Sequence, residues 1–464
     1  MQSPLFRLVR LFMAALVLGF AMVQPAAAQS ILRDSETELL FKDVSKPLIQ
    51  AAGLDPKSVD IVLLGDPEIN AFVATGQIVY IHSGLLVAAD NVNQLQGVIA
   101  HELGHVAGGH AIRMQEGVGE ATGITLATLV LGALAIAAGA PDAGMAVMMA
   151  GQRAALGQFL AFTRTQEASA DQAGAKYLMA AGISGKGSLE FFKKLQNQEY
   201  RLAIYAKDSY DRTHPISGER IAALEKLYEN DPAWSTPSDP RLEERFQRVK
   251  AKLIGFVDPK QAVIKYPESD NSLQAHYARA YAYHLGAYPD KALRETETLL
   301  AARPGDPFFL ELKGQILLES GRPADAIAPL REAVKAAPDQ PLIAAMLGHA
   351  LISTEKKEYF PEAKGILKAA VNRDNQNPFA WYQLGIIYDN EGDQPRAALA
   401  TAERENLEGN PRLAMVSAEQ AMRGIAPGTP DYLRAQDISM VARTELRKID
   451  KKFDREEKKR DEQQ

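Results

Sequence analysis

The segment that decides the fold reads His101-Glu102-Leu103-Gly104-His105 and follows an apolar-periodic stretch, residues 95–100, that predicts a helix. Two histidines four positions apart lie on one helical face, so both imidazoles can bind a single Zn²⁺. Glu102 then lies beside the metal, where its carboxylate can accept a proton from water. A motif of five residues also arises by chance, so the prediction of a zinc site depends on further ligands elsewhere in the chain.

The third ligand distinguishes the classes of zinc peptidase. A metzincin needs a third histidine six residues after His105, but that position is Ala111, and His110 comes one residue too early. On a continued helix His110 would lie about 180° from His101 and point away from the metal. We therefore interpret His110 as a structural or supporting residue, and the metzincin arrangement is excluded.

A gluzincin takes its third ligand from a second helix, with an aspartate one turn later that orients a ligating imidazole. Glu167 and Asp171 are four positions apart, so they share one helical face. An exposed acidic helix face is the alternative. Because the histidine motif precedes this pair, we predict that Glu167 ligates zinc and that Asp171 contacts an imidazole N–H.

The composition limits the other functions open to this chain. Its 464 residues, 46% hydrophobic and 24% charged, are typical of a soluble globular protein with two or three domains. A net charge of −6, without a long basic block, predicts no nucleic-acid partner. The chain has no cysteine, so histidines and carboxylates must hold any metal.

The N-terminus has the pattern of a secretory signal peptide. Arg7 and Arg10 precede an uncharged apolar run at residues 11–23, and small residues follow at 26–28. We predict cleavage after Ala28 and export to a bacterial periplasm. A retained anchor is the alternative, but this run is shorter than the about 20 residues that span a bilayer.

The second half of the chain contains a repeat of 34 residues. Pro304 and Pro338 are separated by this interval, as are Gly314 and Gly348, and three residues are inserted near Lys356. A period of 34 is that of tetratricopeptide (TPR) helix pairs, and the chain resembles that family over about 140 residues. Four copies are expected to begin near Ser272, Asp306, Gln340 and Asn377.

The domain organisation follows from these patterns. We expect a signal peptide at residues 1–28, an α+β zincin metalloprotease domain of the gluzincin type at 29–265 and an all-α TPR solenoid at 266–446. The concave side of such a solenoid usually holds a partner or an extended peptide. Residues 447–464 are mostly charged and are predicted to be a frayed helix or a disordered tail.

Four motifs together resemble the zinc-peptidase family of the CAAX prenyl endopeptidase and HtpX, over about residues 60–225. They are H-E-L-G-H-V-A-G-G-H from position 101, E-A-S-A-D from 167, N-A-F-V-A-T-G-Q-I-V-Y-I-H-S-G-L-L from 70 and T-H-P-I-S-G-E-R-I from 213. The resemblance implies a zinc endopeptidase with one Zn²⁺ per chain. Combined with a signal peptide and a TPR domain, it implies action on unfolded or misassembled outer-membrane proteins, chaperone-like work, and docking of the TPR domain on their assembly machinery.

The same resemblance suggests where a substrate binds. Residues 77–82 are predicted to form a short strand, and zincins hold an extended substrate against the backbone of an edge strand. A core strand is the alternative, and His82 at its end is interpreted as structural. The predicted substrate-binding residues are Asn70, Ala71, Phe72, Ile78, Val79 and Tyr80.

Residues 121–152 are a second apolar stretch, with Asp142 as their one charged residue. The integral members of the family carry clear membrane spans, but ten of the 21 residues at 121–141 are Gly or Ala, which makes insertion marginal. We expect a helical hairpin packed beside the catalytic helices, with Glu167 on the helix that returns from it. A lid or surface that touches the membrane or nascent barrel strands, and a true span, are the alternatives.

His214 has three possible roles. Pro215 biases it toward an extended conformation ahead of a helix that Ser217 can cap. It can be structural, it can donate to the oxyanion of the tetrahedral intermediate, or it can be a removable fourth zinc ligand. We favour the last role, because an exported protease among unfolded clients needs restraint and no segment resembling an inhibitory pro-peptide follows residue 28.

The function that these observations favour is that of an exported zinc metalloendopeptidase. His101, His105 and Glu167 bind the metal, Glu102 is the general base, and Asp171 supports a ligand. The alternative is a TPR binding protein or scaffold whose zincin domain is inactive.

Overall fold

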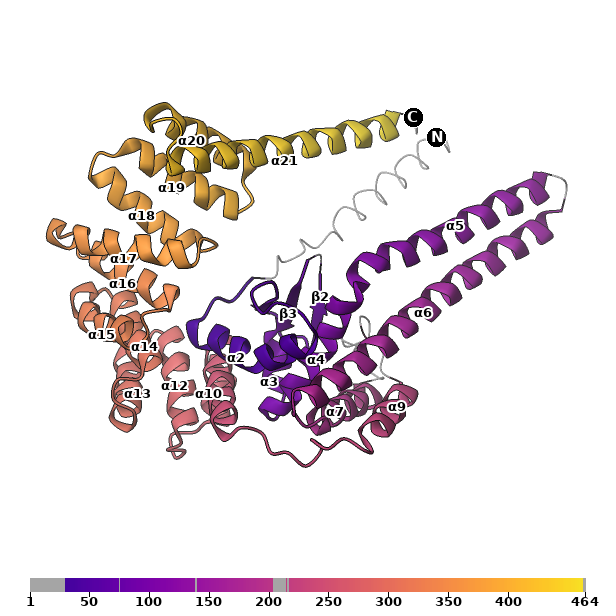
Figure 1. The fold of residues 1–464 in the computed structure, drawn as a ribbon, viewed down its shortest axis with the longest axis horizontal. Coiled ribbons are helices and arrows are strands. Elements are labelled where there is room, and N and C mark those ends of the chain that lie inside the picture. The colour runs from indigo at the N-terminus through magenta and orange to yellow at the C-terminus, as the bar shows by residue number, and fades with distance from the viewer. Residues whose placement is uncertain (1–29, 75, 138–139, 203–213, 215–216, 462–464) are drawn as a thin grey trace, which may run out of the picture.

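The computed structural model describes residues 30–74, 76–137, 140–202, 214 and 217–461. The predicted signal peptide lies outside these residues. In Figure 1 the first half of the chain surrounds a small sheet, the second half forms an arc of paired helices, and one long helical hairpin projects away from both.

The elements of the first half are α2 (Ser35–Ala51), β1 (Asp60–Leu64), β2 (Ala71–Val73), β3 (Ile78–His82), α3 (Ser83–Ala88), α4 (Val92–Gly108), α5 (His110–Ala137), α6 (Pro141–Ala180), α7 (Lys186–Leu202), α9 (Gly218–Tyr228) and α10 (Pro240–Val257). Those of the second half are α11 (Pro259–Lys265), α12 (Leu273–Leu285), α13 (Pro289–Ala302), α14 (Pro307–Glu319), α15 (Pro323–Ala336), α16 (Pro341–Ser353), η1 (Lys357–Tyr359), α17 (Phe360–Arg373), α18 (Pro378–Asn390), α19 (Gln394–Leu407), α20 (Pro411–Gly424) and α21 (Pro430–Asp461). The fold is thus an α+β domain followed by an all-α solenoid, as the sequence predicted.

The sheet has the strand order β1-β3-β2, with β3 parallel to β1 and antiparallel to β2. The prediction that β3 is the edge strand was therefore wrong, because its backbone is paired on both sides. The edge among the described strands is β2. The N–H of His82 donates to the carbonyl of Asn70, so the alternation of an antiparallel ladder turns the backbone groups of Ala71 and Val73 away from β3.

Helix α4 is the central helix of the first domain. The side chain of Asn91 caps its first turn by accepting the N–H of Gln94, and residues 92–105 are all buried. Helix α6 approaches it closely, since a Cβ added to Gly104 would stand 2.7 Å from the carbonyl oxygen of Ala170. This glycine contact brings the two helices that carry the predicted ligands together.

Helices α5 and α6 form the predicted hairpin, and Glu167 lies on its returning helix as expected. The hairpin projects into the surroundings instead of packing beside the catalytic helices along its length, which corrects that part of the prediction (Figure 1). One described helix, His110–Ile136, is long and apolar enough to cross a membrane. Several large apolar side chains of the hairpin, such as Leu131 and Leu134, are exposed and do not contribute to the core of the domain.

The solenoid begins its helix pairs at the predicted positions. Ser272, Asp306, Gln340 and Asn377 are the N-cap residues of α12, α14, α16 and α18. The insertion near Lys356 is the short helix η1. Helices α20 and α21 extend the stack, and the charged segment from residue 447 is the distal part of α21 up to Asp461. The expected boundary at 446 therefore falls inside a helix.

Buried charged groups join the two halves of the chain. Glu36 of α2 lies 2.9 Å from both Lys252 and Arg248 of α10, and it accepts the hydroxyl of Tyr277 of α12 at 2.8 Å. Arg248 also pairs with Asp306 at the start of α14, at 2.8 Å. Because all these partners are largely buried, the solenoid is held against the first domain by a shared polar core.

Candidate metal centre

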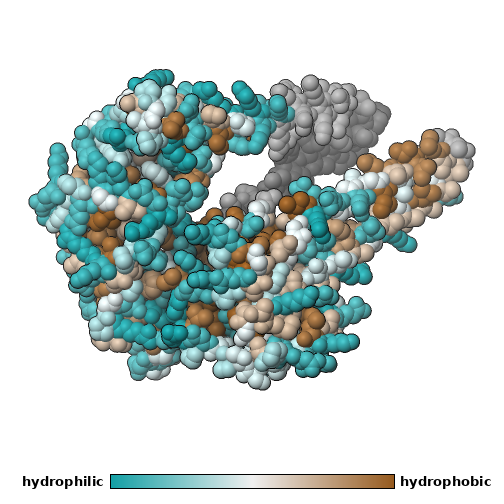
Figure 2. Space-filling view, in the orientation of Figure 1, coloured by the Kyte–Doolittle hydropathy of each residue, from teal (hydrophilic) through white to brown (hydrophobic). Residues whose placement is uncertain are grey.

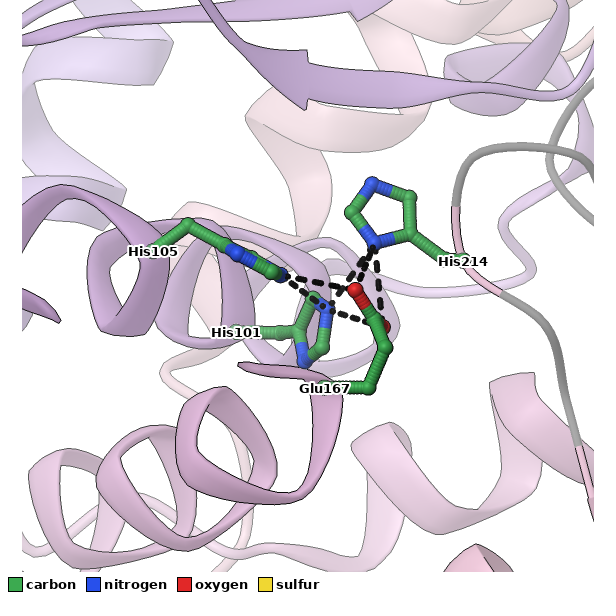
Figure 3. Close-up of side chains that lie close together, drawn as sticks. All are labelled: His101, His105, Glu167 and His214. Carbon is green, nitrogen blue, oxygen red and sulfur yellow. Dashed lines mark hydrogen bonds and ion pairs between the residues drawn. The ribbon is translucent and has the colours of Figure 1, made fainter. Parts of the chain in front are cut away.

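Four side chains from three segments converge beside α4 (Figure 3). His101 and His105 come from α4, Glu167 from α6 and His214 from the segment before α9. All four are buried, and each offers one ligand atom within 4.8 Å of the others. The Nε2 atoms of the two α4 histidines lie 3.1 Å apart, and the carboxylate of Glu167 lies 3.4 Å and 3.3 Å from them.

This donor set fits a divalent metal of the zinc type. Two imidazoles and one carboxylate are ligands that catalytic zinc takes in proteins, with a further position left for water or substrate. Isolated buried charges are costly unless they are paired or bind a metal, and here a carboxylate faces several ring nitrogens in one small space. The structure therefore brings together the three predicted ligands and His214, the residue for which a fourth-ligand role was favoured.

Asp171 lies behind His101, as the spacing predicted. Its Oδ1 is 2.9 Å from Nδ1 of His101, which leaves the Nε2 atom of that imidazole facing the cluster. Arg220 of α9 holds the other side of Asp171 through two N–H donors, at 2.7 and 2.8 Å. The carboxylate of Asp171 is thereby fixed, and it fixes the ring of His101 in turn.

Arg220 is a site residue that sequence reasoning missed. Besides its bidentate contact with Asp171, its guanidinium lies 3.0 Å from Glu167 and stacks over the ring of Phe192. Only 8% of Arg220 is exposed. Its position four residues before the buried Leu224 places it on the inward face of α9, and that spacing was the available signal.

His110 contacts the site, contrary to the expectation that it points away. The expectation assumed one continuous helix, but α4 ends at Gly108, its C-cap Gly109 has a left-handed backbone with φ 64°, and α5 begins at His110. The turn brings Nδ1 of His110 to 2.9 Å from Nδ1 of His105. Burial and the neighbouring His105 lower the pKa of His110 to about 4, so this neutral ring can accept the Nδ1–H of His105. The supporting role predicted for it is consistent with this contact.

Glu102 is fully buried next to the cluster. Among the described residues, neither of its carboxylate oxygens accepts a hydrogen bond, and His214 Nε2 lies 3.6 Å away. A buried carboxylate without such a partner is unfavourable for folding alone. The buried position of Glu102 is therefore explained better by a chemical role at the cluster than by a contribution to stability.

The electrostatics of the cluster favour ionised carboxylates. Burial would raise the pKa of Glu167, but His214 and hydrogen bonds from His101 and His105 hold it well below its usual value. Burial would lower the pKa of His101, yet Asp171 and Glu167 raise it to about 10. Ligating nitrogens must be free of protons, so binding of a metal here is coupled to proton release.

The predicted substrate residues fall into two groups. Ala71 lies on the edge strand β2, and its carbonyl accepts Nε2–H of His214 at 3.1 Å, which places that edge next to the cluster. Asn70 and Phe72 flank it. Ile78, Val79 and Tyr80 lie on the central strand, Val79 is fully buried, and the ring of Tyr80 stacks on Phe72 at 5.2 Å. The structure therefore places Ala71 and Phe72 on the edge strand, with Asn70 directly before it, and it places Ile78, Val79 and Tyr80 on the central strand.

Comparison with known proteins bears on the identity of this domain. Residues 35–228 match the model of Peptidase family M48. This segment is an M48 peptidase domain. The match includes both helices that carry the metal-site residues, so the resemblance drawn from the four sequence motifs is confirmed, and the chain is a metalloendopeptidase.

Relatives share more than the M48 domain. The motifs, the predicted signal peptide and the TPR repeats together predict a likeness to beta-barrel assembly-enhancing protease. That protein of Escherichia coli (strain K12) is 28% identical over 353 residues, and the match covers 73% of this chain and 69% of that protein. Metalloprotease LoiP of the same organism is 31% identical over 158 residues, covering 33% and 56% of the two chains. Among solved structures, YrrB, a TPR protein with an unusual peptide-binding site, has a TM-score of 0.31 and 18% identity, covering 38% of this chain and 91% of that chain.

Proposed function

We propose that this chain is a zinc-dependent endopeptidase in which His101, His105 and Glu167 bind one Zn²⁺. The observation that carries the proposal is the convergence of these buried ligands beside Glu102, within an M48 domain. Zinc bound there supplies a Lewis acid that polarises a peptide carbonyl and acidifies water. The domain organisation proposed with it is residues 29–265 for the protease and 266–446 for the solenoid.

The protein side chains have separate roles in this proposal. Glu102 takes a proton from the attacking water, because it is buried beside the ligands with both oxygens available. Asp171 is a positioning residue that keeps His101 in the ligating tautomer, and Arg220 holds Asp171. An extended substrate pairs with the outward backbone groups of β2, so Ala71 is a binding residue.

His214 is proposed to restrain the enzyme. Its Nδ1 lies 3.1 Å from both oxygens of Glu167, while its Nε2–H donates a hydrogen bond to the carbonyl of Ala71. One imidazole thus stands at the ligand cluster and also covers an acceptor that a substrate strand would use. The fourth-ligand role explains both contacts, whereas an oxyanion donor needs only access to the reacting carbonyl.

Replacing His214 with alanine separates these roles. As a restraint, its loss should raise the rate of cleavage of an unfolded protein at saturating zinc. As an oxyanion donor, its loss should lower the rate by about 10²- to 10³-fold. An unchanged rate would leave a structural role alone.

The cellular setting is proposed from the relatives and the N-terminal pattern. A relative named beta-barrel assembly-enhancing protease matches 73% of this chain, which supports a role in the quality control of outer-membrane proteins. Export to the periplasm with cleavage after Ala28, chaperone-like activity, and docking of the solenoid on the assembly machinery belong to the same proposal.

The decisive test is Glu102→Gln, which keeps shape and ligands but removes the base. The purified chain should bind one zinc per molecule and degrade an unfolded outer-membrane protein, and the variant should bind zinc equally without degrading it. Equal turnover by both proteins would contradict the proposed role of Glu102. A zinc stoichiometry near zero, in protein prepared without chelator, would favour the inactive TPR scaffold.

A further inference from the structure

The outer part of the α5–α6 hairpin, residues 121–137 and 140–152, exposes an unusual amount of apolar surface; we call it the distal hairpin. Figure 2 shows hydrophobic residues gathered at the far end of the projection. Large exposed patches of this kind mark interaction sites in soluble proteins. The exposed side chains, each 40–61% accessible, are Leu126, Leu129, Val130, Leu131, Leu134, Ile136, Met145 and Met149.

The distal hairpin buries small residues between its arms and exposes large apolar ones, which is the reverse of the packing expected for a helical hairpin in water. Its two arms meet through glycines, since a Cβ on Gly132 would stand 2.7 Å from the carbonyl oxygen of Gly144, and one on Gly151 would overlap Thr128. Gly132, Gly144 and Gly151 are buried, whereas Met145, Met149 and the leucines of the first arm are exposed. Helices in water bury their large apolar side chains, whereas helices in lipid associate through small residues.

The polar side chains of the first arm are satisfied without water. The hydroxyls of Thr122, Thr125 and Thr128 each donate to the backbone carbonyl four residues earlier, at 2.7, 3.0 and 2.9 Å. This is a way for threonine to satisfy its hydroxyl in an apolar medium. The uncharged surface therefore presents few polar groups that a protein partner could recognise.

The exposed apolar surface of α5 is wider than a single stripe, although one face of the helix packs on α6. Leu129, Val130 and Leu131 are consecutive, so they point about 100° apart, and all three are exposed. A groove on a protein covers one face of a helix, while lipid covers every face. The surroundings that fit this surface are hydrocarbon chains.

We propose that the distal hairpin inserts into one leaflet of a lipid bilayer and holds the M48 domain at the membrane surface. The uncharged part of the returning arm, residues 143–152, is about 15 Å long at 1.5 Å per residue, which is half of the hydrocarbon thickness of about 30 Å. Arg153 follows this part at the depth where headgroups begin, and Glu120, which is level with Gln158, lies farther from the tip. Both ends of the hairpin stay on the side from which it enters.

Asp142 at the tip of the hairpin opposes insertion, and it supplies a test. Its charge would have to be neutralised within the leaflet, because a charged carboxylate there is strongly unfavourable. Asp142→Asn should therefore increase partitioning into vesicles by about tenfold or more. A surface made to bind an aqueous protein predicts no such gain.

The main experiment measures flotation with phosphatidylcholine vesicles, using the chain from Gln29 so that the apolar N-terminus cannot contribute. Leu131→Lys with Leu134→Lys should reduce the bound fraction about 100-fold or more, because each lysine replaces an inserted leucine. The matched control is Leu413→Lys with Leu433→Lys, which changes equally exposed leucines in the solenoid. The control should float as the parent does, and Glu102→Gln should float likewise, because insertion does not depend on peptidase activity.

Because the chain has no cysteine, a single probe can report the depth of insertion. A polarity-sensitive dye on Leu131→Cys should shift to shorter wavelength when vesicles are added, and the same dye on Leu413→Cys should not. The proposal is overturned if the parent chain stays with the soluble fraction, or if the lysine pair leaves flotation unchanged. It is also overturned if that pair abolishes capture of an unfolded outer-membrane protein without affecting flotation, since the hairpin would then be a client-binding surface.

Discussion

Replacing Asp171 with asparagine tests whether the residues behind His101 control metal binding. The substitution keeps the shape of the side chain and an oxygen near Nδ1 of His101, but it removes the negative charge that faces this ring at 2.9 Å. It also takes from Arg220 the carboxylate that accepts its two N–H groups, at 2.7 and 2.8 Å. The guanidinium also lies 3.0 Å from Glu167, so after the substitution it should compete more strongly with the metal for that ligand.

The expected loss of zinc affinity can be estimated from two effects, both of which weaken metal binding. Weaker orientation of a ligating imidazole costs about 10- to 100-fold in metal affinity, or about 1.4 to 2.7 kcal/mol. The removal of one negative charge near a divalent cation adds to this loss. Replacing charge-assisted hydrogen bonds within a buried pair should also lower the free energy of unfolding of the metal-free protein by about 1.5–3 kcal/mol.

The assay is zinc affinity, measured by competition with a chelator, together with thermal unfolding of the metal-free protein. The matched control is Asp231→Asn, which changes another buried aspartate in the same half of the chain, one that caps the N–H of Ala233. The control should lower stability without lowering zinc affinity. A zinc dissociation constant for Asp171→Asn within threefold of the parent value, or an equal change in the control, would refute the reasoning.

A second substitution, at Arg220, tests whether this arginine acts on zinc binding through Asp171. In the Asp171→Asn background its guanidinium is a buried cation with reduced compensation beside a metal site. Adding Arg220→Met should therefore recover part of the zinc affinity, so the two substitutions should be strongly non-additive. Additive losses would show that Arg220 and Asp171 act separately.

Four further substitutions test the surroundings of the site. Gly104→Ala should force α4 and α6 apart, at a cost of about 1–3 kcal/mol in stability, and weaken zinc binding in the same chelator assay. Val73→Pro removes an outward N–H from β2 and should raise KM for an extended peptide with little change in Tm, whereas Phe72→Pro removes a ladder hydrogen bond and should lower Tm; equal behaviour would contradict the edge assignment. Lys252→Met removes one of the two cations that lie 2.9 Å from buried Glu36 and leaves Arg248, so it should destabilise the chain by about 1.5–3 kcal/mol in denaturant unfolding, with zinc affinity unchanged.

The features that the sequence predicted correctly depend on local signals. Each predicted repeat starts at a helix cap, and the side chains of Ser272, Asp306 and Asn377 accept backbone N–H groups in the first turn of the helix that follows. Most of these helices also have proline at the first positions, where its missing N–H is harmless. Such signals act over a few residues, so a single sequence suffices to locate them. The same holds for the spacing of His101 and His105 on one helix.

The features that were missed depend on contacts between distant segments. The open edge of the sheet belongs to β2, because β3 pairs with β1 as well, and the order of strands is not written in any one strand. Arg220 was missed because a buried arginine is exceptional, and its carboxylate partners lie about fifty residues upstream. The position of His110 was wrong for a local reason, because one glycine, Gly109, ends the helix that was assumed to continue.

Helix α6 shows both kinds of exception within one continuous helix. Before Arg153 its buried positions are glycines, and Met145 and Met149 are exposed, which reverses the pattern of a helix in water. Near its other end it buries Glu167 and Asp171, which reverses the rule that charged side chains face solvent. Asp171 pairs with Arg220 and His101 within the chain, while Glu167 also faces the cluster that we propose binds a metal. Met145 and Met149 lie on the hairpin that we propose inserts into lipid, so at both places the proposed partner of this helix is not protein.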